Sequence, residues 1–247
     1  MCGPQQLLIL ATLVACSAGT VAGQSPDEAL YYAVRSTAVM YQLSDTTRPY
    51  VSLKLREPVF RTGGDSHWTQ VRTTDGARGQ IRSEDISNIW IRISKESQTL
   101  FVYRGDELIR RLPADLGYNF FSDKVKRGDV RDPDHWRTPN GVFYVVNKNA
   151  RSQYHKAFVL NYPNREDAVR GLRDSLITAS QYRAIVRADS MVSMPPMNTE
   201  LGGWIEIHGE GTGRRANWTQ GCIAVLNESI DALWDLIHVG TPVVIEP

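Results

Sequence analysis

The stretch WIEIHGEGTGRRANWTQGCIAVLN (204–227) contains two short segments whose residues alternate as they do in β-strands. The first segment places Trp204, Glu206 and His208 on one face of a strand. The second segment begins at Cys222. The loop between them carries glycines at positions 209, 211, 213 and 221. Two neighbouring strands joined by such a loop can place an imidazole at the end of one strand beside a thiol at the start of the other.

Cys222 and His208 are therefore a candidate nucleophile and a candidate general base. Cys222 is the one cysteine beyond the N-terminal leader, and a lone thiol in an oxidising compartment is a candidate reactive group. An imidazole that accepts the thiol proton activates the sulfur. Gly221 permits a tight turn that can aim the backbone amides of Gly221 and Cys222 at an oxyanion. Since no acidic residue is an obvious partner for His208, the Gly209 carbonyl is expected to orient its ring.

The motifs around these residues resemble the L,D-transpeptidase (YkuD-type) family, and within it the murein L,D-transpeptidase subgroup. His208-Gly209, the glycine-rich loop and the segment TQGCI (219–223) match the catalytic signature of the family. Further matching segments are GD (128–129), RTPNGVFY (137–144), NYPN (161–164) and GTPV (240–243). Gln220 departs from the pattern, because many members have a histidine there, and this leaves the substrate preference open.

The resemblance implies a mainly β, mixed α+β chain in which a β-sandwich-type catalytic domain with a few helices spans residues 90–247. It also implies a two-step acyl transfer, in which Cys222 forms a thioester with a peptidoglycan tetrapeptide stem and an amine or water receives the acyl group. No cofactor and no metal site are expected. Candidate substrate-binding residues are Trp218, Thr219, Tyr162 and Arg137. The aromatic side chains among them are equally typical of a β-domain core.

A second β-rich segment precedes this domain. The pattern W-x-x-V-R-T-x-D-G-x-x-G-x-I (68–81) resembles a bacterial Src-homology-3-like (SH3-like) module, with a hairpin turn at Asp75-Gly76. This module is predicted over residues 31–88, after a polar linker at 24–30. An unrelated β-extension of the main domain is the alternative. Helices are expected after Asn164, with Asp167 in a capping box, and from Asn227 to Gly240.

The N-terminus predicts export. LLILATLVA (7–15) is shorter than the roughly 20 residues that a spanning helix needs, and has the length of a signal-peptide core within residues 1–23. Two cleavage sites remain open. LVAC (13–16) resembles a lipobox that would lipidate Cys16, whereas VAG (21–23) suits ordinary signal peptidase. The expected location is the periplasm or cell envelope, with membrane contact only through such a lipid anchor.

The charge balance excludes a nucleic-acid partner, because 28 Lys and Arg offset 27 Asp and Glu. The expected partners are peptidoglycan stem peptides and, as acceptor or substrate, a wall-attached protein. Two alternatives to the transpeptidase stay open. One is a carboxypeptidase or amidase of the same mechanism. The other is an inactive wall-binding lipoprotein, since a single Cys or strand-end His is more often structural than catalytic.

Overall fold

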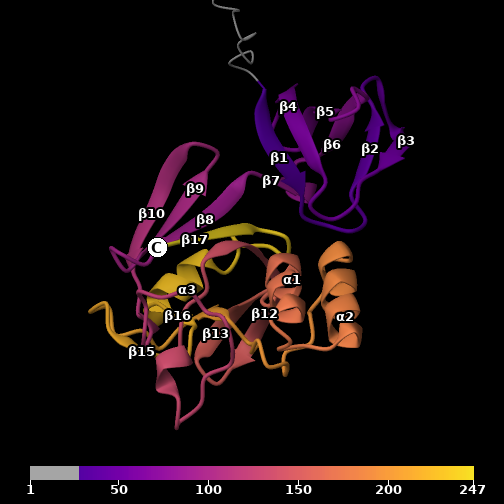
Figure 1. Ribbon diagram of the computed structural model, residues 1–247. Coiled ribbons are helices and arrows are strands. Elements are labelled where there is room, and N and C mark those ends of the chain that lie inside the picture. Colours follow the sequence, from indigo (N-terminus) through magenta and orange to yellow (C-terminus); the bar gives the residue numbers. More distant parts are fainter. Residues whose placement is uncertain (1–27) are drawn as a thin grey trace, which may run out of the picture.

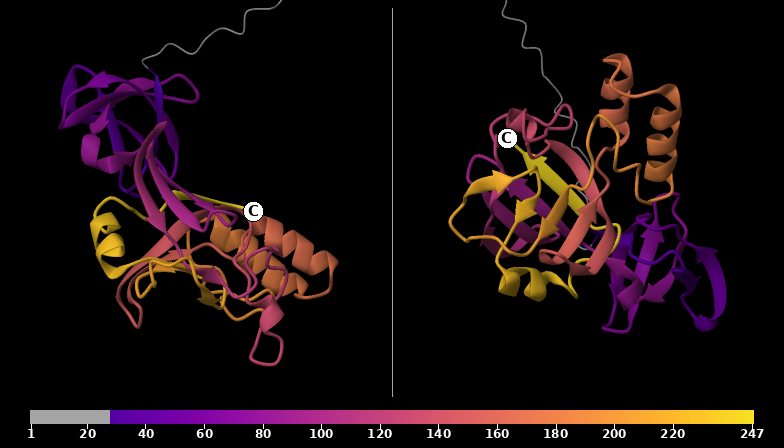
Figure 2. Two further views of the ribbon diagram at one scale, coloured as in Figure 1. Left: turned by 90° about the vertical axis from the view of Figure 1, so that its left-hand side faces the viewer. Right: turned by 90° about the horizontal axis from the view of Figure 1, so that it is seen from below.

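The computed structural model describes residues 28–247, so the expected leader and Cys16 lie outside the described residues. Strands make up 42% of the chain and helices 15%, which confirms the mainly β fold class. Two large sheets follow one another along the sequence, and Figure 2 shows the N-terminal sheet beside the remainder of the molecule. Each sheet encloses its own cluster of buried apolar side chains.

The N-terminal sheet has the strand order β3-β2-β6-β5-β4-β1-β7 (Figure 1). Its strands are β1 (Ala29–Ala33), β2 (Val39–Gln42), β3 (Asp45–Ser52), β4 (Pro58–Gly64), β5 (Trp68–Thr73), β6 (Arg78–Arg82) and β7 (Ile86–Ser87). The predicted hairpin is confirmed, because β5 and β6 pair antiparallel around Gly76, which has a φ of +94°. The linker prediction was too long, since β1 begins at Ala29. The likeness to an SH3-like module stays a prediction.

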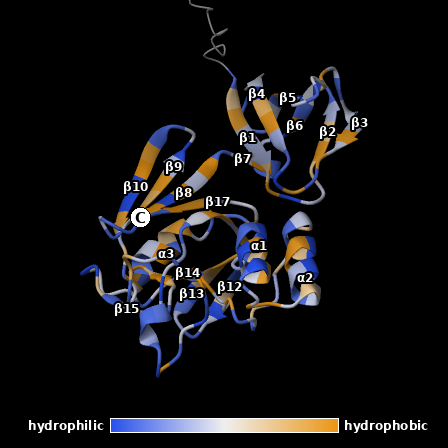
Figure 3. Ribbon diagram, viewed as in Figure 1, coloured by the Kyte–Doolittle hydropathy of each residue, from blue (hydrophilic) through white to orange (hydrophobic). Residues whose placement is uncertain are grey.

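The larger sheet has the order β10-β9-β8-β17-β12-β13-β14-β16. Its strands are β8 (Ile89–Ser94), β9 (Thr99–Arg104), β10 (Glu107–Pro113), β12 (Gly141–Ser152), β13 (His155–Leu160), β14 (Glu206–His208), β16 (Ile223–Ala224) and β17 (Pro242–Glu246). The alternation of Ile89, Ile91 and Ile93 buries every second residue of β8. Figure 3 colours hydrophobic and hydrophilic residues differently and shows both kinds along the strands of this sheet. A separate short parallel pair joins β11 (Leu116–Gly117) to β15 (Asn217–Thr219).

Two helices, α1 (Arg165–Arg173) and α2 (Ala179–Ser190), form a pair beside β12 (Figure 1). The predicted capping box is confirmed, because the Asn164 side chain accepts from the Asp167 amide and Asp167 accepts from the Asn164 amide. The C-terminal helix α3 (Asn227–Leu233) is shorter than predicted, and Asn227 does not cap it. The Asn227 side chain instead bonds to the backbone and the carboxylate of Glu210, in the loop that follows β14.

A long loop, residues 118–140, runs along one side of the site without regular strands. Lys95 holds this loop in place. Its buried Nζ donates to three oxygens of the loop: Ser122 O at 2.9 Å, Thr138 O at 3.1 Å and Asn140 Oδ1 at 2.8 Å. An ammonium group has three donors, so all of them are used within the protein. Lys95 is therefore a structural residue that ties the end of β8 to the loop.

The two sheets touch through a few polar and aromatic contacts. Tyr32 in β1 donates to the Ile89 carbonyl at 2.5 Å, and the Arg56 guanidinium lies 3.8 Å from the centre of the Tyr144 ring. The cation–π contact is of the kind that stabilises by about 0.5–2 kcal/mol. Within residues 28–247, no helix has the length and apolar character needed to cross a membrane.

Candidate active site

His208 is the last residue of β14, and Cys222 immediately precedes the adjacent parallel strand β16. Ile207 in β14 is paired with Ile223 in β16, and His208 is paired with Ala224. By the same register, Cys222 lies opposite Glu206, and paired residues point to the same face of a sheet. Since Glu206 and His208 alternate with Ile207, Cys222 shares their face. The predicted strand is shorter than expected, because Trp204 has a φ of +54° and turns away before β14 begins.

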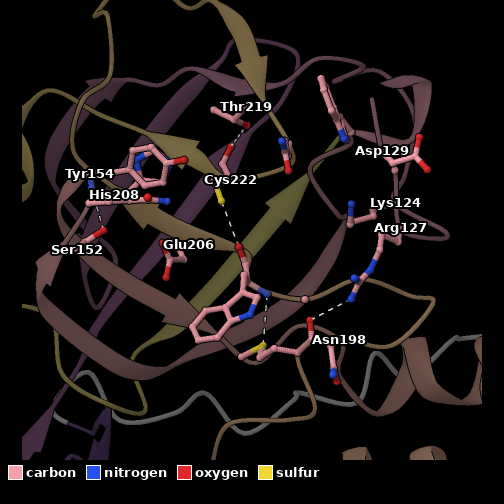
Figure 4. A pocket seen from close by; sticks show the side chains of 18 of the residues that line it. Lys124, Arg127, Asp129, Ser152, Tyr154, Asn198, Glu206, His208, Thr219 and Cys222 are labelled. Carbon is pink, nitrogen blue, oxygen red and sulfur yellow. Dashed lines mark hydrogen bonds between the residues drawn. The ribbon is translucent and has the colours of Figure 1, made fainter. Parts of the chain in front are cut away.

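Both side chains open into a cavity of about 1220 Å³ (Figure 4). Its walls come from the loop 118–140, the β12–β13 turn, the segment before β14 and the loop before β16. Among its lining residues are Lys124, Arg127, Tyr154, Trp204, Glu206 and Trp218. A cavity of this size suits a peptide rather than a small metabolite. No group of three His, Cys, Asp or Glu side chains within residues 28–247 is arranged to bind a metal ion.

The His208 ring is held by three neighbours. Its Nδ1 lies 2.6 Å from the Gly209 carbonyl oxygen, the group that the sequence suggested for this contact. Tyr154 stacks on one side of the ring at 4.5 Å, and Trp218 meets it edge-on at 6.2 Å. A proton on Nδ1 that is donated to a carbonyl leaves Nε2 as the acceptor. Burial lowers the pKa of His208 below 6.5, so the ring is neutral at neutral pH.

The Cys222 thiol donates to the Trp204 carbonyl oxygen at 3.3 Å in the resting structure. Burial raises the pKa of Cys222 to about 12, and the nearby Glu206 carboxylate adds to the rise. The resting site therefore contains a neutral thiol and a neutral imidazole, not a thiolate–imidazolium ion pair. A proton acceptor must act during nucleophilic attack, because almost no thiolate exists beforehand.

The turn before Cys222 is braced by Thr219. Its hydroxyl accepts from the Gly221 amide at 3.2 Å and donates to the Cys222 carbonyl at 2.7 Å. Gly221 has a φ of +128°, and a Cβ there would lie 2.5 Å from the Arg137 carbonyl oxygen, so only glycine fits. Two expectations need correction here. The Gly221 amide is already bonded in the resting state, and Thr219, although beside the cavity, uses its hydroxyl within the turn.

Two other candidates for substrate binding are not at the cavity. Tyr162 is fully buried in the core, and its hydroxyl donates to the Leu201 carbonyl at 2.9 Å. Arg137 donates to the carbonyl oxygens of Asp134 and Asp123 and pairs with the Asp134 carboxylate, so its guanidinium stabilises the loop 118–140. Both residues lie in segments that match the family, but a matching segment does not show whether a side chain binds substrate or stabilises the fold. Trp218, by contrast, does line the cavity and is 41% exposed.

Asp115 organises the loop between β14 and β16, a role that no sequence pattern indicated. Its buried carboxylate accepts from the Thr212 amide (2.6 Å), the Thr212 hydroxyl (2.9 Å), the Ala216 amide (2.8 Å) and the Trp218 indole (2.9 Å). Burial opposes the charge on Asp115, but these hydrogen bonds outweigh it and lower the pKa below 3.8. Through Trp218, Asp115 fixes one wall of the site.

Comparison with family models assigns the catalytic part of the chain. The L,D-transpeptidase catalytic domain (YkuD) model matches residues 88–245. The chain belongs to this family. The family resemblance read from the sequence is thereby confirmed for the catalytic domain. A search of curated proteins finds no match.

Solved structures of L,D-transpeptidases and related proteins also match. Bd1075 of Bdellovibrio bacteriovorus is 24% identical over 65% of this chain, with a TM-score of 0.38. The helical cell shape determining protein Pgp2 of Campylobacter jejuni is 22% identical over 64%, with a TM-score of 0.41. The chain spans 47% and 46% of these two structures. An L,D-transpeptidase from Mycobacterium smegmatis is 15% identical over 89% of this chain and 82% of its own, with a TM-score of 0.38.

Proposed function

We propose that this chain is a peptidoglycan L,D-transpeptidase, with Cys222 as nucleophile and His208 as general base and acid. The observation that supports the proposal best is that the thiol and the imidazole enter one peptide-sized cavity from adjacent strands. Membership of the L,D-transpeptidase family supports the reaction class. We also propose that the protein is exported and acts in the periplasm or cell envelope, where its substrate is.

In the first step the Cys222 sulfur attacks the carbonyl carbon at the L-centre of the diamino acid in a tetrapeptide stem. The sulfur–carbon bond forms as the thiol proton passes to Nε2 of His208. The carbon–nitrogen bond then breaks, and the imidazolium returns the proton to the departing amine of D-alanine. The Cys222 amide is the proposed oxyanion donor, and losing one such donor typically costs about 2.7–4 kcal/mol of transition-state stabilisation.

In the second step an acceptor attacks the thioester. An amine gives a new amide bond, His208 takes the surplus proton, and the sulfur regains it as the sulfur–carbon bond breaks. Water at the same carbon gives a carboxylic acid, which is the carboxypeptidase outcome. The relative access of amine and water decides between them.

The test is the Cys222→Ala variant with purified tetrapeptide muropeptides, followed by mass spectrometry of the products. Wild type is expected to release D-alanine and to form crosslinked or hydrolysed products, whereas the variant forms none. Cys222→Ala removes little buried volume, so its thermal melt should match that of wild type. Equal turnover by the two proteins would contradict the proposal.

A carbapenem, an acylating probe for this family, separates the enzyme from an inactive wall-binding protein. Intact-protein mass spectrometry should find one adduct on wild type and none on Cys222→Ala. The inactive alternative stays open because of Gln220, which replaces the histidine of many members. Gln220 is exposed at the cavity and lies two positions before Cys222 in the sequence. Absence of the wild-type adduct at high probe concentration would favour the inactive alternative.

A further inference from the structure

Two oppositely charged side chains flank the Cys222 sulfur without pairing with each other. Lys124 comes from the loop 118–140 and Glu206 from β14, and both line the cavity. Lys124 is 3% exposed and Glu206 is 9% exposed. In Figure 4 they lie on opposite sides of the sulfur. Both charges influence the sulfur, because Glu206 raises and Lys124 lowers the pKa of Cys222.

Glu206 has no partner within residues 28–247. No hydrogen-bond donor and no basic side chain of this part of the chain reaches its carboxylate, and burial raises its pKa. Its oxygens are not sealed within the protein but face the cavity, where the walls exclude much of the water that would otherwise solvate the charge. A ligand that brings a cationic donor into the cavity would satisfy it.

Lys124 is only partly satisfied. Among the described residues, its Nζ donates to the His135 carbonyl oxygen at 3.2 Å, which leaves two of the three ammonium donors for a ligand. The Lys124 Cε lies close to Gly202, since a Cβ added to Gly202 would be 3.2 Å from it. The Lys124 side chain is therefore beside the segment that leads to Trp204. Burial lowers the pKa of Lys124 to about 8, so the group is mostly protonated at neutral pH.

We infer that Lys124 and Glu206 bind two oppositely charged groups of one substrate, the terminal carboxylate of the stem peptide on Lys124 and the free amine of its diamino acid on Glu206. This inference rests on the proposed function, because it places the scissile carbonyl at Cys222. A tetrapeptide stem carries both of these groups, one on each side of that carbonyl. The leaving D-amino acid then extends toward Lys124, and the side chain of the diamino acid extends toward Glu206.

The charge pair selects a substrate class. A stem that ends in a free carboxylate satisfies Lys124, whereas an amidated or extended stem leaves the ammonium buried without its anion. A diamino acid satisfies Glu206, whereas a residue without the second amine leaves the carboxylate unpaired. Discrimination by unsatisfied buried polar groups is strong, since each charge-assisted hydrogen bond contributes about 10- to 100-fold.

The experiment crosses substrates with variants. Wild type, Lys124→Met and Glu206→Gln are each assayed with a tetrapeptide that ends in a carboxylate and with its C-terminal amide. They are also assayed with a tetrapeptide that contains diaminopimelate and with its 2-aminopimelate analogue, which lacks the second amine. Lys126→Met is the matched control, because Lys126 pairs with Asp132 at 3.1 Å and does not line the cavity.

Wild type and Lys126→Met are expected to prefer the free carboxylate by about 10- to 100-fold in kcat/KM, mainly through KM. Lys124→Met should lose this preference and keep the preference for the amine. Glu206→Gln should lose the preference for the amine and keep the preference for the carboxylate. The inference is overturned if wild type shows neither preference, a comparison that needs no variant to fold, or if Lys124→Met still prefers the carboxylate.

Binding of the same peptides to Cys222→Ala, measured by calorimetry, separates this inference from the proposed function. Charge preferences in the dissociation constants without wild-type turnover would support the charge pair and overturn the transpeptidase. Turnover without either preference would overturn the charge pair alone. Neither turnover nor binding would overturn both.

Discussion

Replacing Asp115 with Asn tests whether this carboxylate organises the active-site loop. Each of its two oxygens accepts two hydrogen bonds, Oδ2 from the Thr212 amide and the Trp218 indole, and Oδ1 from the Thr212 hydroxyl and the Ala216 amide. An amide keeps one oxygen, so two of the four bonds are lost whichever way it is oriented. The new amide nitrogen is also a donor that faces two donors.

The magnitude follows from this count. Hydrogen bonds to a charged group stabilise by roughly 1.5–3 kcal/mol each. Water can replace part of this at a loop, so we expect the Asp115→Asn variant to lose about 3 kcal/mol in the free energy of unfolding. For a chain of this size that lowers the Tm of the catalytic domain by about 6–12 °C. The exposed Asp106 supplies a control, Asp106→Asn, which should change the Tm little.

The same variant should slow acylation of Cys222 by a carbapenem at least about tenfold, because displacement of Trp218 releases one side of the His208 ring. The stabilisation also depends on pH. Since the folded pKa of Asp115 is lowered, its contribution is present above the unfolded pKa of about 3.9 and is lost as the pH falls through the folded value. A variant with the wild-type Tm and acylation rate at neutral pH would refute the role of Asp115.

Thr219→Val removes the hydroxyl that links the Gly221 amide to the Cys222 carbonyl, so acylation should slow about 10- to 100-fold, whereas Thr219→Ser should stay near wild type. Stopped-flow acylation measures this, and equal rates for the two variants would count against a braced turn. A second prediction concerns pH. Burial lowers the pKa of His208, so kcat/KM should stay high below pH 6.5 and fall only as the pH drops through the folded value. Because the pKa of Cys222 is about 12, the ultraviolet absorbance of a thiolate should not appear near pH ~8.5, where an exposed thiol titrates, with Cys222→Ala as the blank.

Local patterns in the sequence were sufficient for much of the fold. Asp75-Gly76 predicted the β5–β6 turn, and Asn164 with Asp167 predicted the start of α1, because turns and helix caps depend on neighbouring residues. The shared face of Glu206 and His208 on β14 also followed from alternation. The parallel pairing of β14 with β16 did not, since pairing depends on how distant segments meet.

The charged residues of the site could not be found in this way. Lys95 and Lys124 occur in polar stretches, where a lysine is usually exposed, yet the fold buries both. Asp115 lies between apolar residues with no motif around it, and its four donors are about 100 positions away in the sequence. Arg137 shows the opposite error. It lies in a motif that matches the family, but its guanidinium is used within the loop 118–140.

The neutral state of the Cys222 thiol protects it from oxidation in the periplasm or cell envelope, the location that we propose. Oxidants react with a thiolate far faster than with a thiol, so an exported nucleophile that is ionised at rest would be lost to oxidation. Burial and Glu206 keep Cys222 protonated, and its proton is donated to the Trp204 carbonyl instead of to His208. A substrate amine bound to Glu206 neutralises the charge that opposes ionisation. Activation of the sulfur would then depend on the presence of the substrate, which is the condition under which a reactive thiol is useful.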